Sequence, residues 1–373
     1  MQRIGIFGGS FNPVHNEHVK IAKGAVKELN LDKLFVMPTY VSPHKIGEDL
    51  LSGEDRLNML KLAFLGVENI EISDYELSQK GVSYTYLTVL HFKKLYPNSK
   101  LYFILGSDML EDFPTWKNPQ IIVENANLVL LNREGMGEND SEAISKIKTL
   151  YNKGVISLKT KGLSVSSTEI RLRIKLNLDV SNLIDKKVEN YLLKNNLFKA
   201  DKYYNYINQN LPLKRKIHTL GVILTAIDFA KRLKESEKKA EISALLHDMA
   251  KYKTASEVKG FIPPSDCTNE VLHQFLGEYL ARTELEIIDE DILNAIKYHT
   301  TGRANMSNLE KIVYVADLIE PSRTYEMVDY LRKVMKGDFE KGFAVCVKEV
   351  LDFLKLKGGE IYYLTYEAYK YYC

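Results

Sequence analysis

Residues 3–18, RIGIFGGSFNPVHNEH, carry the most specific structural signal in the N-terminal half of this chain. The apolar run 4–7 is typical of a buried strand, and Gly8 and Gly9 follow it directly. Glycines at the end of a strand let a phosphate approach the backbone without meeting a Cβ atom. Pro13 then fixes a turn ahead of a helical periodicity, so the stretch predicts a strand, a glycine-containing turn and a helix.

Short apolar runs and helical periods alternate through the rest of this half. Further strands are expected at 33–37, 70–72, 101–105 and 127–131, and helices at 18–29, 56–65, 85–96 and from 167 toward 197. Such alternation predicts an α/β domain with a parallel sheet and helices on both faces. The first strand should be central, and its carboxyl end should open into the site.

The second half differs, because strand signals stop near residue 213. Helices are expected at 214–233, 237–247, 256–259, 270–283, 290–299, 308–319, 325–335 and 338–355, and the tail is open to one more. This pattern predicts an all-α bundle. A polar stretch rich in Tyr and Asn, residues 199–209, is the expected linker, so we expect domains at 1–198 and 210–373.

Composition excludes several classes of protein. Of 373 residues, 45% are hydrophobic and 27% are charged, as in a globular protein of two domains. The net charge of +2 gives no overall field for nucleic acid or an anionic membrane. No leader and no membrane-length apolar run is seen, so we expect a cytoplasmic protein without nucleic-acid or membrane partners. Its three cysteines form no disulfide framework, and the oligomeric state, including a homo-oligomer, stays open.

Two histidines stand at the start of the first helix. His15 and His18 are three residues apart, so they share one helix face. Imidazoles beside the exposed backbone N–H groups of a helix N-terminus suit a polyphosphate. A single histidine here would be explained equally well as a cap or surface residue, but the complete string is more specific.

The complete string resembles the (T/H)xGH-type signature of the nucleotidyltransferase superfamily, with His18 as its final histidine. The match is closest to bacterial nicotinate-mononucleotide adenylyltransferases, the NadD family. Four other segments resemble motifs of that family: residues 38–45, Ser83-Tyr84-Thr85, Gly106-Ser107-Asp108 with Trp116, and residues 165–171. The resemblance covers residues 1–198 and implies a Rossmann-like fold. Glu17 in a usual glycine position and Leu87 in a usual aspartate position depart from the pattern.

The resemblance implies adenylyl transfer, in which nicotinate mononucleotide attacks the α-phosphorus of ATP, pyrophosphate leaves and Mg²⁺ accompanies the ATP phosphates. The implied catalytic residues, which stabilise or hold phosphate oxygens, are His15, His18, Lys45 and Arg171. The implied nucleotide-binding residues are Gly8, Gly9, Ser10, Phe11, Thr85, Gly106, Asp108, Trp116, Ser167 and Thr168. A plain core aromatic is the alternative for Trp116, but its polar loop favours a platform for the ligand.

A dispersed set of histidines and aspartates marks the second half. His247 and Asp248 end an apolar helix, where both side chains can turn toward one ion. Asp317 lies in another apolar run, and an unpaired buried carboxylate is costly. Any one of these histidines alone is better explained as a core or surface residue. The expected ligands, enough for two ions that share Asp248, are His218, His247, Asp248, His273, His299 and Asp317.

The strings around these ligands resemble HD-domain phosphohydrolases: ALLHDMAK at 244–251, YHTTGR at 298–303 and ADLIEP at 316–321. They look like the YqeK-type family of symmetrical diadenosine tetraphosphate hydrolases, which use a pair of metal ions. The resemblance covers residues 203–373 and implies an HD-domain helical bundle, two-metal hydrolysis to two ADP, and iron as the metal. Sites made of His and Asp also accept Mn, Co, Ni and Zn. It further implies that Asp248 bridges the ions, and that Lys251 and Arg303 neutralise the polyphosphate, a solvated loop charge being the alternative for Arg303.

Two alternative functions stay open at this point. The first domain could use nicotinamide mononucleotide or another phosphorylated acceptor, while the second cleaves a different nucleotide. The HD domain could instead be a nucleotide-sensing module that regulates the adenylyltransferase. The complete ligand set and the retained Lys251 favour catalysis.

Overall fold

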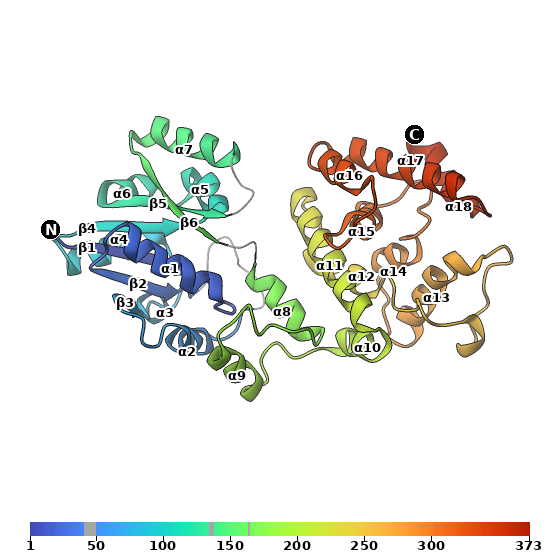
Figure 1. Cartoon of the computed structure of the whole chain (residues 1–373), viewed down its shortest axis with the longest axis horizontal. Helices are drawn as coiled ribbons and strands as arrows, with labels where there is room; N and C mark the ends of the chain where they lie inside the picture. The colour runs from blue at the N-terminus through green and yellow to red at the C-terminus, as the bar shows by residue number, and fades with distance from the viewer. Residues whose placement is uncertain (41–49, 134–137, 163–164) are drawn as a thin grey trace. The chain divides into compact units, whose positions relative to one another are not determined.

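A computed structural model describes residues 1–40, 50–133, 138–162 and 165–373. They form two compact units, Met1–Arg171 with Asp179–Phe198, and Leu172–Leu178 with Lys199–Cys373 (Figure 1). The short segment belongs to the second unit because Leu172, Leu176 and Leu178 are buried in its hydrophobic core. The expected boundary at residue 198 therefore misses the two earlier crossings of the chain between the units, on either side of residues 172–178.

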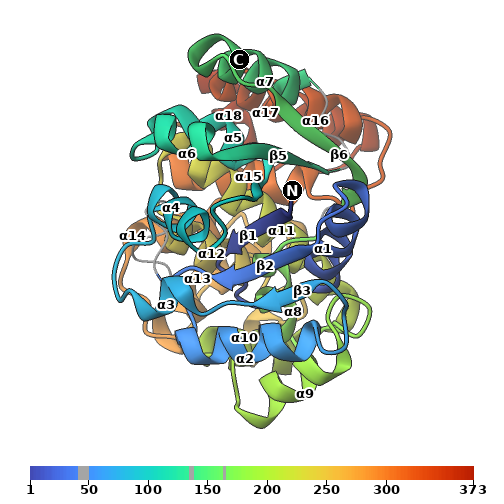
Figure 2. The same ribbon diagram turned by 90° about the vertical axis from the view of Figure 1, so that its left-hand side faces the viewer.

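The first unit is built on a six-stranded sheet whose neighbouring strands are all parallel in the described residues. The spatial order is β3-β2-β1-β4-β5-β6. The strands are β1 (Arg3–Gly9), β2 (Lys33–Pro38), β3 (Ile70–Ile72), β4 (Lys100–Leu105), β5 (Ala126–Arg133) and β6 (Val155–Gly162). Figure 2 turns β1, β2 and β3 toward the reader. The predictions of a parallel sheet and of a central first strand are confirmed.

Helices follow the strands of this unit. They are α1 (Asn16–Glu28), α2 (Gly53–Ala63), α3 (Tyr75–Ser78), α4 (Thr85–Leu95), α5 (Ser107–Asp112), α6 (Pro119–Asn125), α7 (Glu138–Tyr151), α8 (Ser167–Lys175) and α9 (Lys186–Lys194). Helices α3, α5, α6 and α7 and strand β6 were not predicted. Strand β6 lies at the edge of the sheet, where Leu158 is buried but Ile156 is 38% exposed. Because an edge strand buries few side chains, its sequence has no long apolar run that would predict it.

The described part of the second unit contains helices and no strand, so the all-α prediction is confirmed. The helices are α10 (Lys202–Asn210), α11 (Leu213–Leu233), α12 (Glu237–Leu246), α13 (Asn269–Thr283), α14 (Glu290–Lys297), α15 (Asn308–Ile319), α16 (Val328–Met335), α17 (Phe339–Lys357) and α18 (Tyr363–Tyr372). Helices α11, α12, α14 and α15 pack on one another around a shared core. His218 lies on α11 and Asp317 on α15, whereas His247 and His299 follow the last residues of α12 and α14.

Two local predictions for this unit were wrong. Residues 199–209, expected as a linker, are mostly helix α10, capped by the Asp201 carboxylate. Tyr204 and Ile207 of α10 are buried in the helical core, and their spacing had been hidden by the polar residues between them. Residues 256–259, expected as a helix, contain only the 3-10 turn Ala255–Glu257.

No helix in the described ranges is both long and apolar enough to cross a membrane.

Candidate active sites

The loop after β1 forms the floor of the first site. Phe11 lies in the left-handed region at φ +46° and is buried, with its ring 4.9 Å from that of His18. A Cβ atom at Gly9 would stand 3.1 Å from the Phe11 ring, so glycine permits this close approach. A Cβ atom at Gly8 would have no described heavy atom within 4 Å, which leaves room beside the strand end for a ligand.

The two histidines predicted to bind phosphate lie together at the start of α1. Their rings stack at 3.6 Å between centroids, with 27° between the planes. His15 is the N-cap residue of α1, and its backbone N–H donates to Nδ1 of His18 at 3.2 Å. Since Nδ1 accepts this bond, neutral His18 carries its proton on Nε2, where it can donate to a phosphate oxygen.

The N-terminal end of α8 is anchored to the same loop. The Ser167 hydroxyl donates to the Pro13 carbonyl at 2.9 Å. Arg171 donates to the Asn12 carbonyl at 2.9 Å and to the Thr168 hydroxyl at 3.1 Å. These contacts bring residues from two distant motifs to one place, so the starts of α1 and α8 lie beside a single loop. Helix N-termini and a guanidinium together favour a polyphosphate ligand.

Sequence reasoning missed Arg56 on α2. Arg56 is only 2% exposed, although it is a charged residue on a surface-type helix. Its guanidinium donates to the carbonyls of Ser10 at 3.0 Å, Thr39 at 2.7 Å and Leu51 at 3.1 Å. Arg56 therefore ties the loop after β1 to the chain segments that follow β2. An arginine among the leucines of this helix was the available signal.

Replacing Arg56 by Met should destabilise the protein by about 3 kcal/mol, because several buried carbonyls would lose their donors. Urea unfolding at equilibrium would measure this loss. Lys61→Met is the matched control, since Lys61 is an exposed cation on the same helix and should change stability by less than about 0.5 kcal/mol. Equal stability of the two variants would contradict a structural role for Arg56.

The structure describes only some of the other residues predicted for the first site. Thr85 begins α4, and Gly106 is the N-cap residue of α5. Trp116 is half-buried and packs on Phe113 with 5.3 Å between ring centroids, so it belongs partly to the core while one part stays accessible. Lys45 and the side chain of Asp108 lie outside what the structure describes.

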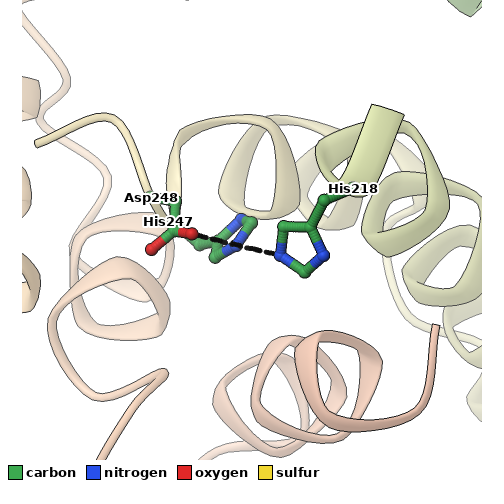
Figure 3. Close-up of side chains that lie close together, drawn as sticks. All are labelled: His218, His247 and Asp248. Carbon is green, nitrogen blue, oxygen red and sulfur yellow. Dashed lines mark hydrogen bonds and ion pairs between the residues drawn. The ribbon is translucent and has the colours of Figure 1, made fainter. Parts of the chain in front are cut away.

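The six predicted metal ligands of the second unit converge on one centre. Figure 3 shows three of them, with the His218 ring and the Asp248 carboxylate on either side of His247. Two sets of three residues have ligand atoms within 4.8 Å of one another: His218, His247 and Asp248, and Asp248, His273 and His299. All five are buried, and Asp317 joins the first set with Oδ1 3.1 Å from Nε2 of His218.

Asp248 lies between the two sets. Its Oδ2 is 3.6 Å from Nε2 of His247, and its Oδ1 is 3.4 Å from Nε2 of His273 and 3.7 Å from Nε2 of His299. Each carboxylate oxygen therefore faces a different set of imidazoles. A carboxylate in this position can bridge two cations.

Backbone contacts orient two of the imidazoles. Nδ1 of His247 lies 2.6 Å from the carbonyl of Ala244, and Nδ1 of His299 lies 2.8 Å from the carbonyl of Ile296. A carbonyl can only accept, so Nδ1 carries the proton and the Nε2 lone pair faces the centre. This is the tautomer that a metal ion requires.

The charges of the centre also suit a cation. Burial lowers the pKa of His247 to about 4 and that of His273 to about 3, so both imidazoles are neutral at neutral pH. Burial opposes ionisation of Asp248, but contacts with His247, His299 and Lys251 hold its pKa well below the usual range. Neutral imidazoles around a carboxylate are the donor set of a transition metal.

Acidification should therefore destabilise the metal-free protein between about pH 6.5 and 4. His247 and His273 have folded pKa values below their usual 6.5, so the unfolded chain binds protons more readily in this window and stability falls as pH falls. His218 acts in the opposite direction: burial lowers its pKa, but hydrogen bonds with Asp317 and Glu320 outweigh burial and raise it. Urea midpoints from pH 7 to 4.5 would test this.

His273→Gln is the control for this pH dependence. Glutamine cannot bind the proton, so the variant should lose stability less steeply with falling pH than the unaltered protein. Identical slopes for the two proteins would contradict the assignment.

Cations surround the centre, and they are only partly those predicted. Lys251, for which the motif implies a contact with polyphosphate, lies 3.5 Å from Oδ1 of Asp248. Arg215 on α11, which the sequence analysis missed, donates to Oδ2 of Asp248 at 2.8 Å. Arg323 forms an ion pair with Asp317. The sequence did offer a signal for both arginines, because Arg215 lies one turn before His218 and Arg323 lies six residues after Asp317.

Arg303, predicted to contact phosphate, is engaged elsewhere. Its guanidinium forms two hydrogen bonds with the carboxylate of Glu310, at 2.7 and 3.1 Å, and lies over the ring of Tyr298. Glu310 is 1% exposed and also caps the start of α15. Arg303 would have to leave this buried ion pair to bind substrate, so its phosphate role stays a prediction.

A cavity of about 1430 Å³ adjoins the metal-like centre within the second unit. His299, Asp317 and Arg323 line it on the side of the centre, and Tyr325 and Tyr362 contribute aromatic surface. Carboxylates also line the cavity, among them Glu270, Glu326 and Glu349.

Comparison with known proteins identifies both units. Residues 6–173 match the cytidylyltransferase-like family, and residues 215–322 match the HD domain. A Mycoplasma genitalium protein named "Probable nicotinate-nucleotide adenylyltransferase/Ap4A hydrolase" is 32% identical over 365 residues, 95% of this chain and 99% of that protein. A Clostridium tetani protein named "Probable nicotinate-nucleotide adenylyltransferase" is 42% identical over 200 residues, 53% of this chain and 100% of that protein.

Among solved structures, a predicted HD superfamily hydrolase involved in NAD metabolism from Clostridium acetobutylicum matches 46% of this chain and 95% of its own at 40% identity, with a TM-score of 0.44. The matched families define a cytidylyltransferase-like nucleotidyltransferase unit joined to an HD-domain unit. The chain belongs to the family of fused nicotinate-nucleotide adenylyltransferases and HD-domain hydrolases that the Mycoplasma genitalium protein represents. Both resemblances expected from the motifs are confirmed at this level.

Proposed function

We propose that the first unit transfers the adenylyl group of ATP to nicotinate mononucleotide. The meeting of His15, His18 and the start of α8 at one loop carries this proposal. A phosphate oxygen of the mononucleotide forms a bond to the α-phosphorus of ATP, the bond from that phosphorus to the bridging oxygen breaks, and pyrophosphate leaves. No protein nucleophile is needed, so positioning and charge neutralisation supply the catalysis.

Each group at this loop has a task in the transfer. Nε2–H of His18 donates to the phosphate oxygens on which charge develops. The Arg171 guanidinium and the backbone N–H groups near Ser167 and Thr168 hold the departing pyrophosphate, and Mg²⁺ enters as part of the ATP substrate. As the motifs imply, Lys45 would hold phosphate oxygens, Asp108 and Thr85 would bind the nucleotides, and Trp116 would offer its ring to the ligand.

The acceptor is tested by assaying the purified protein with ATP and either nicotinate or nicotinamide mononucleotide. We expect faster turnover of the nicotinate form, which the naming of the relatives supports. Equal or faster turnover of the nicotinamide form would overturn the acceptor assignment.

For the second unit we propose symmetrical hydrolysis of diadenosine tetraphosphate at a two-metal centre. The observation that carries this proposal is the pair of ligand sets that share Asp248. The residues fit such ions: buried neutral imidazoles and an ionised carboxylate converge, with their tautomers fixed toward the centre. His218, His247 and Asp317 would hold one ion, His273 and His299 the other, and the motif resemblance favours iron. Bound ions supply a reactive nucleophile at neutral pH and neutralise charge on phosphate oxygens.

The surrounding residues bind and orient the substrate. Lys251, Arg215 and Arg323 lie at the carboxylates of the centre and would turn to the polyphosphate once cations neutralise those carboxylates. The cavity beside them has room for a nucleoside, and Tyr325 and Tyr362 offer ring surfaces to its base. Addition of water across the central phosphate bridge then releases two ADP.

The test of the second activity is product analysis of metal-loaded protein with diadenosine tetraphosphate. Two ADP per substrate consumed is the expected result. Release of ATP and AMP would overturn symmetrical cleavage. Tight binding without any product would favour the regulatory sensing module instead.

A further inference from the structure

Glu320 is a fully buried carboxylate beside the metal-like centre, and neither the family comparison nor the motifs assign it a task. It follows the last turn of α15 and has 0% exposure. Its Oε1 lies 2.9 Å from Nδ1 of His218. The Ser322 hydroxyl donates to Oε1 at 2.5 Å, the Ser322 backbone N–H donates to Oε2 at 2.7 Å, and Nε of Arg323 lies 3.9 Å from Oε1. Burying a carboxylate costs free energy unless partners stabilise its charge, so the contacts of Glu320 indicate what it does.

The packing around Glu320 is built to admit it. Gly221 lies one turn after His218 on α11, and a Cβ atom there would collide with the Glu320 carboxylate. Glycine in a helix interior is ordinarily unfavourable. Its use here leaves the space through which the carboxylate reaches the far nitrogen of His218.

We propose that Glu320 is a positioning residue for His218, and that Gly221 makes this contact possible. The carboxylate accepts the Nδ1 proton of His218, which turns the Nε2 lone pair toward Asp317 and Asp248. His247 and His299 obtain the same orientation from backbone carbonyls, which carry no full charge. Glu320 therefore makes His218 the more basic ligand and strengthens one ion position of the two. This inference rests on the proposed two-metal function.

The test is Co²⁺ titration of the metal-free full-length chain, followed by calorimetry and by visible absorption, with Glu320→Gln beside the unaltered protein. Glutamine keeps the size of the side chain but loses the charge and one acceptor oxygen. The remaining oxygen cannot serve His218 and both donors of Ser322. We expect one of two Co²⁺ ions to bind roughly 10- to 100-fold more weakly, with a changed absorption band, and the other to bind as before. Gly221→Ala should give the same selective loss by displacing the carboxylate.

Glu310→Gln is the matched control, because Glu310 is a second buried carboxylate on α15 that pairs with Arg303 instead of a ligand. It should alter the thermal midpoint without altering Co²⁺ affinity. Unchanged affinity at both ions in folded Glu320→Gln would overturn the inference, as would an equal loss in Glu310→Gln. Failure of the unaltered protein to bind Co²⁺ would overturn the metal centre itself, which distinguishes the two results.

Discussion

Replacing Asp248 by Asn should reduce hydrolysis of diadenosine tetraphosphate by about a thousand-fold or more and leave adenylyl transfer unchanged. Asp248 is the residue common to both ligand sets, with one oxygen toward His247 and the other toward His273. Asparagine keeps the shape but removes the negative charge and one oxygen ligand. Loss of a shared ligand removes several kcal/mol of transition-state stabilisation, and each ~1.4 kcal/mol is a factor of ten in rate.

The experiment follows ADP and nicotinate adenine dinucleotide in separate assays of the same preparation. Adenylyl transfer is the internal control for folding, since both activities reside on one chain. Asp228→Asn is the matched variant, because Asp228 is an exposed carboxylate on α11. If Asp248→Asn still hydrolysed the substrate at a tenth of the normal rate, the assignment of Asp248 as the shared ligand would be contradicted.

Replacing His18 by Ala should reduce kcat for adenylyl transfer by about 100- to 1000-fold and leave hydrolysis intact. The loss of one preorganised donor to a developing oxyanion has an effect of this size. The backbone N–H of His15 fixes the proton of His18 on Nε2, and the stacked His15 ring limits its rotation. Because the effect belongs to the transition state, KM for ATP should change much less than kcat.

Steady-state kinetics with ATP and nicotinate mononucleotide would separate these parameters. His91→Ala is the control, since His91 is another half-buried histidine that stacks on an aromatic ring, that of Tyr75. A rise in KM with unchanged kcat in His18→Ala would mean that His18 binds the ground state and the transition state equally. A comparable fall of kcat in His91→Ala would mean that the lower rate comes from loss of folded protein and not from loss of a catalytic group.

The candidate sites divide into parts that the sequence could predict and parts that it could not. The (T/H)xGH-type string and the His-Asp doublet were visible because their residues are close in sequence or lie at strand and helix ends. Arg56 was not visible, because its partners are carbonyls of residues 10, 39 and 51, which only folding brings together. Arg303 illustrates the opposite case: its position suggested phosphate contact, but Glu310 holds it.

The local pattern could be predicted from the amino-acid sequence: a strand, a glycine turn and a helix at the start, all-α periodicity after residue 213, and the residue types of both sites. Periodicity and motif spacing depend on neighbours along the chain, so they can be read without coordinates. Which side chains share a partner became known only from the packing of the folded chain. It placed residues 172–178 in the helical unit, set Asp248 between two groups of imidazoles, and put Glu320 behind His218. These contacts depend on how separate helices pack, which no local pattern records.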